Sequence, residues 1–160
     1  MKKTLTSFVF AVTCVFLSTG QPALAAGGSS NYTTGSSSKQ ESKKPEEYKK
    51  AVKLLGDEKY EEANKVLNSL LPASDRDADV HNLIAFSYRK SGQLDQAETH
   101  YKKALTLDPE HRGALEYQGE LFLTQGRPDK AENNLRKLGK ICGSSCKEYK
   151  ELAEAIENGQ

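Results

Sequence analysis

The sequence predicts an all-α fold: a right-handed α-solenoid of three helical hairpins followed by a C-terminal capping helix. Alanines recur 34 residues apart, at Ala63, Ala97 and Ala131. Several columns of small and of large apolar residues keep the same spacing. A fixed period of about 20 to 50 residues is typical of solenoids, in which each unit buries its apolar face only by stacking on its neighbours.

The columns contain the residue types that helix packing requires. Small residues let two helix backbones approach, and large residues fill the groove between them. The small column is Ala51, Ala85 and Gly119; the larger apolar columns are Leu54, Tyr88 and Phe122, then Leu67, Tyr101 and Leu135, then Leu70, Ala104 and Leu138. We therefore expect helices at 45–56, 58–71, 78–91, 94–107, 112–125 and 128–140.

The helix ends follow from turn residues. Gly92 and Gly126 are expected to take a left-handed conformation at the ends of two helices, and Pro109 to stop another. In the first hairpin the corresponding turn position holds Glu58, and the proline of that copy, Pro72, is displaced. The packing of the first hairpin is thus the least regular of the three.

The central copy resembles the tetratricopeptide repeat (TPR). Its matching residues are Ile84-Ala85, Tyr88, Gly92, Ala97, Tyr101, Ala104 and Asp108-Pro109. The resemblance covers about residues 44–145 and implies repeats at 44–77, 78–111 and 112–145. His81 departs from the frequent tryptophan of the family and is expected to pack in the core, while Gln118 replaces a leucine and Gly143 the closing proline.

The first 43 residues read as segments outside the repeats. Residues 1–25 have the pattern of a cleaved signal peptide: two lysines, a short apolar stretch, and small residues at Ala23 and Ala25. Residues 26–43 form a Gly/Ser-rich linker with too little apolar surface to fold. We expect export to the periplasm of a Gram-negative cell, with no membrane insertion after cleavage and no lipidation at Cys14.

Residues 146–160 are predicted to form the capping helix. Tyr149, Leu152, Ala153 and Ile156 lie on one helical stripe, and charged residues cover the rest of the surface. Terminal helices of solenoids need such a polar outer face to stay soluble.

Cys142 and Cys146 remain after signal cleavage, and in an exported protein this pair predicts a disulfide at the turn before the cap. A Cys-x3-Cys pair also suits a soft metal ion or redox chemistry, and this alternative stays open. The pattern lacks a nearby methionine, and the histidines are scattered. His100 and His111 are expected to face solvent.

Composition excludes several functions. The chain has 23 basic and 22 acidic residues, and cleavage of the signal removes Lys2 and Lys3, which leaves a net charge of −1. Nucleic-acid binders, in contrast, are usually strongly basic. No nucleophile with a paired base and no glycine-rich phosphate loop is present. The sequence predicts no enzyme and no cofactor.

The resemblance implies that the first helix of each repeat lines a concave peptide-binding groove. The corresponding residues are Tyr48, Val52, Leu55, Asn82, Phe86, Arg89, Lys90, Glu116, Tyr117, Glu120 and Leu123. Phe86 is either a binding anchor or a packing residue against the next repeat. We expect a protein- or peptide-binding adaptor of the cell envelope; the alternatives are a homo-oligomeric scaffold and a thiol-based metal or redox carrier.

Overall fold

The computed structural model describes residues 46–159, so the predictions for 1–25 and 26–43 lie outside the described residues. Within this range it contains seven helices and no strand. They are α1 (Glu46–Gly56), α2 (Tyr60–Ser74), α3 (Ala78–Lys90), α4 (Leu94–Leu107), α5 (Arg112–Thr124), α6 (Pro128–Cys142) and α7 (Lys147–Glu157). The prediction of an all-α solenoid is confirmed.

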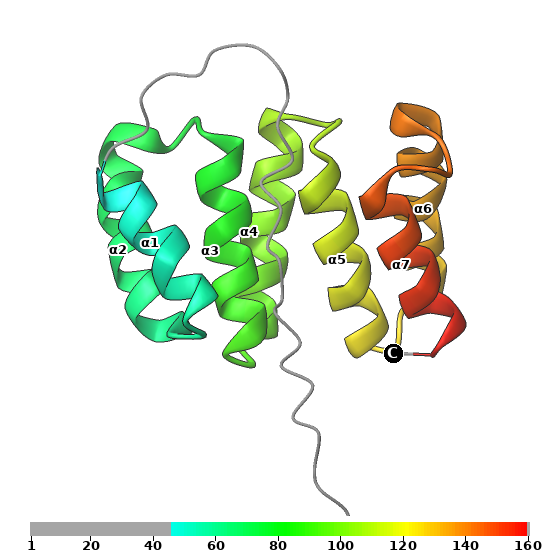
Figure 1. Ribbon diagram of the computed structural model, residues 1–160, viewed down its shortest axis with the longest axis horizontal. Coiled ribbons are helices and arrows are strands. Elements are labelled where there is room, and N and C mark those ends of the chain that lie inside the picture. The colour runs from blue at the N-terminus through cyan, green and yellow to red at the C-terminus, as the bar shows by residue number, and fades with distance from the viewer. Residues whose placement is uncertain (1–45, 160) are drawn as a thin grey trace, which may run out of the picture.

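The helices stand side by side in chain order, as three hairpins and a last helix (Figure 1). The first helices of the hairpins and the cap contact each other in sequence, α1 to α3, α3 to α5 and α5 to α7. In contrast, no Cα atoms of α2, α4 and α6 come within 8 Å of one another. The described stack is therefore closed along one face, which we call the A face (α1, α3, α5 and α7), and opened along the other, the B face (α2, α4 and α6).

The three turns between paired helices have one backbone geometry. Gly92 and Gly126 have φ angles of 76° and 69°, as predicted, and Glu58 takes the same left-handed conformation with φ 57°. In each turn a backbone N–H bonds back across five residues, for example Lys59 to Leu54 at 2.9 Å. The second helix of the first repeat therefore begins at Tyr60, not at 58, because Glu58 belongs to the turn.

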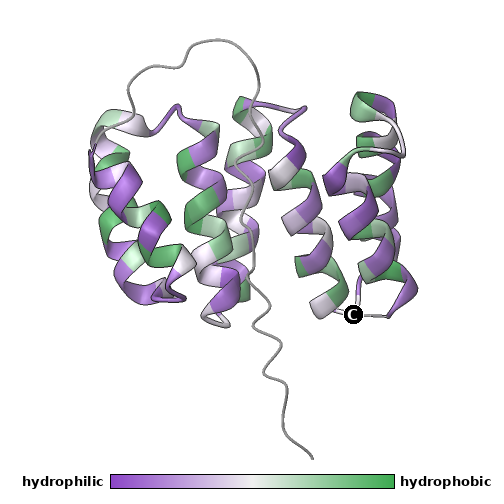
Figure 2. Cartoon of the chain, viewed as in Figure 1, coloured by the Kyte–Doolittle hydropathy of each residue, from purple (hydrophilic) through white to green (hydrophobic). Residues whose placement is uncertain are grey.

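The core forms from the repeated columns and divides into two clusters. One cluster joins α1 to α4 with part of α5, and the other joins α5, α6 and α7; the partly buried Leu105 packs against both. Apolar and polar residues alternate along every helix, as amphipathic packing requires (Figure 2). None of the helices in 46–159 is long and apolar enough to cross a bilayer.

The C-terminal ends of two helices run further than predicted. α2 continues past Pro72 to Ser74, and α6 ends at Cys142 rather than at 140. Cys142 and Cys146 form a disulfide with their Cα atoms 5.9 Å apart, on either side of a turn in which Gly143 has φ 76°. The bridge connects the end of α6 to the start of α7, where the sequence places it.

The histidine prediction is correct for His81, which is buried, and wrong for His111. His111 is 2% exposed because it caps α5 from inside the stack. Its Nδ1 accepts a hydrogen bond from the N–H of Ala114 at 3.1 Å, so its Nε2 carries the proton and donates to Asp79 of α3 at 3.0 Å. His100, also expected to face solvent, is instead half-buried against His81, with their Nδ1 atoms 3.1 Å apart.

Candidate functional site

The eleven predicted groove residues occupy two depths of the A face. Six form the buried floor: Tyr48, Leu55, Asn82, Phe86, Glu116 and Tyr117. The other five keep exposed surface: Val52, Arg89, Lys90, Glu120 and Leu123. A ligand on this face would therefore contact the second set directly, and the first set would position it.

Phe86 belongs to the core, which decides between the two interpretations of this residue. It is 2% exposed. Its ring lies 6.3 Å from the ring of Tyr60 in the previous repeat and 5.0 Å from that of Tyr117 in the next. The aromatic side chain thus joins three successive repeats and offers no free surface to a partner.

Arg89 crosses from α3 to α5 on top of this aromatic floor. Its Nη2 lies 2.6 Å from Oε2 of Glu120, and its guanidinium carbon lies 5.5 Å and 5.8 Å from the ring centroids of Phe86 and Tyr117. The side chain of Glu120 is 30% exposed and that of Arg89 11%. The guanidinium is therefore held in place by stacking and by one ion pair, while the carboxylate remains accessible from outside.

A hollow of about 200 Å³ opens beside this ion pair, between α3, α5 and α7. It is lined by Arg89, Lys90, Glu120, Leu123, Thr124 and Ala155. The lining combines two cations, one carboxylate and apolar surface. Chemically, it provides charge-assisted hydrogen bonds to either sign of charge and a small apolar contact.

Glu116 is a second carboxyl on the A face and is kept neutral. It is 2% exposed, and its Oε2 makes no hydrogen bond among the described residues. Burial, followed by the nearby Glu120 and Glu151, raises the pKa of Glu116 to about 9. At neutral pH this residue is an uncharged acid below the surface, so the charge of the hollow is set by the residues above it.

Sequence reasoning missed two residues of the hollow, Thr124 and Ala155. Ala155 comes from α7, because the cap packs on α5 as the first helix of a fourth repeat would. The apolar stripe of α7 could have indicated that this helix packs on α5, since its residue Leu152 is fully buried against Gly119. The capping helix therefore completes the site as well as covering the core.

One group of three possible metal ligands occurs within residues 46–159: Cys142, Cys146 and Glu148, with ligand atoms within 4.8 Å of one another. Both sulfur atoms are engaged in the disulfide. A metal ion would need them as two thiolates, so this group requires prior reduction of the bridge. The thiol-based alternative remains a hypothesis that depends on reduction.

Comparison with known proteins agrees with this fold. The family model described as tetratricopeptide repeat matches residues 78–111, the central hairpin. No curated protein sequence matches the chain. The translocator chaperone SycD of the type III secretion system of Yersinia enterocolitica is similar in structure, with a TM-score of 0.64 and 22% identity over 71% of this chain and 80% of SycD.

Two further structures show the same arrangement. SycD in complex with a peptide of the translocator YopD has a TM-score of 0.61 and 23% identity over 71% of this chain and 86% of that one. MamA from Desulfovibrio magneticus RS-1 has a TM-score of 0.58 and 25% identity over 62% of this chain and 56% of MamA. The class defined by the fold is the helical-hairpin solenoid. More specifically, the central hairpin at residues 78–111 matches the tetratricopeptide repeat, and the solenoid around it is similar to those of SycD and MamA.

Proposed function

We propose that this protein is a non-enzymatic adaptor that binds a peptide segment of a partner protein on its A face, at the hollow between α3, α5 and α7. The observation that carries the proposal is the Arg89–Glu120 pair, fixed on an aromatic floor beside exposed Lys90 and partly exposed Leu123. Pre-positioned charges next to apolar surface are what a peptide-binding groove requires, because little side-chain entropy is then lost on binding. The similar structure of SycD in complex with a peptide of the translocator YopD supports the proposal.

The hollow favours a segment of mixed character. Arg89 and Lys90 attract a carboxylate, whereas Glu120 and the apolar edge at Leu123 favour a neighbouring cation and an aliphatic side chain. At about 200 Å³ the hollow holds one or two side chains. The rest of the segment would lie along the A face.

Site-specific crosslinking tests the proposal. A photocrosslinker replaces Lys90 beside the hollow, and a matched chain carries it at Lys65, an exposed residue of α2 on the B face. We expect a partner to be captured from position 90 and not from position 65, and the capture to weaken when Glu120→Lys is added. Equal capture from both positions, or no effect of Glu120→Lys in a folded chain, would contradict the proposal.

We further infer that the protein works in the cell envelope after removal of residues 1–25. The support comes from the pattern of residues 1–25 and from the two cysteines, since disulfides persist in exported proteins. Fractionation of the native host with N-terminal sequencing is the test: the mature chain should begin at Ala26 in the periplasmic fraction. An intact Met1 on a cytoplasmic chain would overturn this localisation.

The homo-oligomeric scaffold is the second candidate function, and one observation favours it. SycD, which has a similar fold, forms an alternative dimer in one of its structures, so a protein of this fold pairs with itself. Sedimentation over a wide range of concentrations separates the candidates. A strict monomer would remove the scaffold, and a dimer that blocks crosslinking from Lys90 would remove the peptide adaptor.

A further inference from the structure

A second hollow opens on the B face, between α4 and α6. It measures about 540 Å³ and lies where the backbones of these two helices stay apart, so that residues of α5 line it between them. Its lining residues are Lys102, Leu105, Thr106, Gln118, Phe122, Lys130, Asn133, Asn134 and Lys137. We call this surface the B-face groove; it shares no lining residue with the hollow on the A face.

The lining of the B-face groove carries an excess of positive charge. Its lining contains three exposed lysines and no carboxylate. Lys102 pairs with Glu98 at 2.8 Å, but Lys130 and Lys137 have no ion pair among the described residues. Because the walls are protein rather than water, the fields of these cations add inside the groove.

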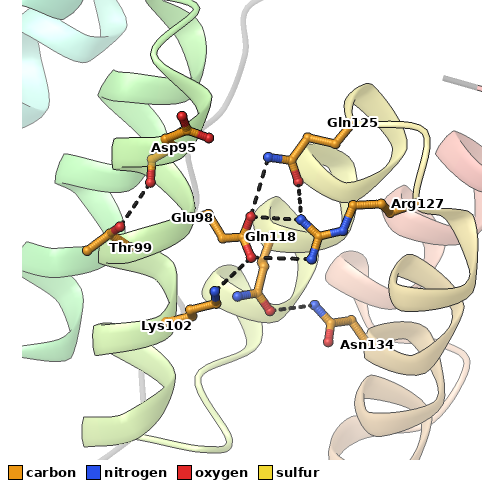
Figure 3. Close-up of polar contacts among 8 residues, drawn as sticks. All are labelled: Asp95, Glu98, Thr99, Lys102, Gln118, Gln125, Arg127 and Asn134. Atoms are coloured by element: carbon orange, nitrogen blue, oxygen red, sulfur yellow. Dashed lines mark hydrogen bonds and ion pairs between the residues drawn. The ribbon is translucent and has the colours of Figure 1, made fainter.

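The floor adds an unused hydrogen-bond donor. Asn134 donates to the carbonyl of Leu115 and to Oε1 of Gln118, each at 3.0 Å. This fixes the amide of Gln118 so that its Nε2 points toward α4 and Lys102 (Figure 3). Gln118 is 6% exposed, and its Nε2 makes no hydrogen bond within residues 46–159. This donor lies in the lining of the groove, where water or a ligand can accept its hydrogen bond.

Apolar surface lies next to these donors. Leu105 is partly exposed between the two core clusters, and the ring of Phe122 forms the base, with the ammonium of Lys130 at 5.5 Å from its centroid. A ligand that fits therefore carries carboxylates and one aliphatic side chain. α4 is 14 residues long, roughly 21 Å, which an extended chain of about six residues spans.

We propose that the B-face groove binds an extended acidic segment of a partner protein, with carboxylates toward Lys130, Lys137 and Gln118 and an aliphatic side chain against Leu105. Charge complementarity selects this occupant. The chain's own residues 26–45 carry Lys39, Lys43 and Lys44 against Glu41, so they have the wrong sign. This proposal concerns another face and does not depend on the A-face adaptor role.

Fluorescence anisotropy with designed peptides tests the B-face groove. The probe is a labelled peptide of about eight residues that alternates Glu and Ser around a central Leu, and its partner peptide has Gln in place of every Glu. The groove variant is Lys130→Glu with Lys137→Glu. The control variant is Lys65→Glu with Lys150→Glu, two exposed lysines outside the groove that give the same change in net charge.

We expect the acidic peptide to bind at least tenfold more tightly than the Gln peptide, with an affinity that falls as salt rises. The groove variant should weaken binding by about tenfold or more and the control variant by less than about twofold. Equal losses in both variants would show a net-charge effect and overturn the proposal. So would a wild-type dimer that the groove variant dissociates, which would make the occupant a second copy, or binding to anionic vesicles without binding of the peptide. Crosslinking from Lys90 is unaffected by the groove variant if the two faces are independent.

Discussion

Glu58, Gly92 and Gly126 occupy the same left-handed position in three successive turns, but only two of them are glycines. A side chain in this conformation crowds the following carbonyl, at a cost of roughly 1–2 kcal/mol. We therefore expect Glu58→Gly to raise the free energy of unfolding by about 1 kcal/mol. The counterpart, Gly92→Ala, should lower it by a similar amount, since a β-carbon there meets no atom within 4 Å and only the backbone opposes it. Urea denaturation measures both changes, and a loss of stability in Glu58→Gly would show that the glutamate makes a compensating contact.

The raised pKa of Glu116 leads us to expect an unusual dependence of stability on pH. Burial raises the pKa of this carboxyl to about 9 from its ordinary value of 4.5, so folding takes up a proton between these two pH values. Stability must then fall as pH rises through this window, by at most about 1.4 kcal/mol per pH unit from this group. Glu116→Gln removes the proton uptake. We expect the free energy of unfolding of Glu116→Gln, relative to that of the wild type, to increase from pH 5 to pH 8, as measured by denaturation at each pH. Parallel curves for the two proteins would contradict the shifted pKa.

Residues differ in how much of their role the sequence could reveal. The Gly92 and Gly126 turns were predictable because the 34-residue period places a left-handed residue there. For Phe86 the sequence permits two roles, since a concave-facing position and an inter-repeat contact have the same spacing. The burial of His111 cannot be predicted from the sequence, because its position between Asp79 and the Ala114 amide is set by the stacking of one repeat on the next. Local sequence contains no such information.

At the scale of helices, the cap depends on one small residue. A β-carbon on Gly119 would lie 2.5 Å from Cδ1 and 2.7 Å from Cδ2 of Leu152, which is fully buried. Gly119→Ala gains about 1 kcal/mol of helix propensity but overpacks this contact at a cost of about 1–3 kcal/mol. We expect a net loss of stability, with faster hydrogen exchange in α7 than in α3.

A double-mutant cycle tests this contact directly. Leu152→Ala alone should cost roughly 2–5 kcal/mol by opening a cavity. In the double variant the alanine at 119 enters the space that Leu152 vacates, so the combined loss should be smaller than the sum of the two. If the two losses of stability are additive, residues 119 and 152 do not interact and the cap does not depend on this contact. The sequence predicted both the small column and the apolar stripe of α7, but it could not show that one fits into the other.

Across the whole molecule, a polar seam lies between the second and third repeats on the B face. Arg127 Nη1 lies 2.8 Å from Oε2 of Glu98, and Lys102 Nζ lies 2.8 Å from Oε1 (Figure 3). The Arg127–Glu98 pair connects α4 to the third repeat on the B face, whereas the Lys102–Glu98 pair lies within α4. In a solenoid, the free energy of interaction between neighbouring repeats decides whether they unfold together.

Glu98→Gln should therefore uncouple the two halves. The hydrogen bonds of Glu98 to two cations are worth roughly 1–3 kcal/mol in all, because both partners are charged and the side chain is 14% exposed. We expect a lower slope of unfolding free energy against urea, together with faster amide exchange in α6 and α7 than in α3 and α4. Glu132→Gln, which breaks an exposed pair with Arg136 on α6, is the control and should change stability by less than about 0.5 kcal/mol.

Acid should reproduce this uncoupling in the unmodified protein. The hydrogen bonds from Arg127 and then from Lys102 lower the pKa of Glu98 to about 2 from its ordinary value of 4.5. A lowered pKa gives a contribution that is complete above pH 4.5 and is lost as the pH falls through about 2. Between these values the exchange rates of α6 and α7 should rise relative to those of α3 and α4 in the wild type. In Glu98→Gln the ratio should stay constant, because the group that takes up the proton is gone. A ratio that changes equally in both proteins would assign the acid response to other carboxyl groups and leave the seam without a role in cooperativity.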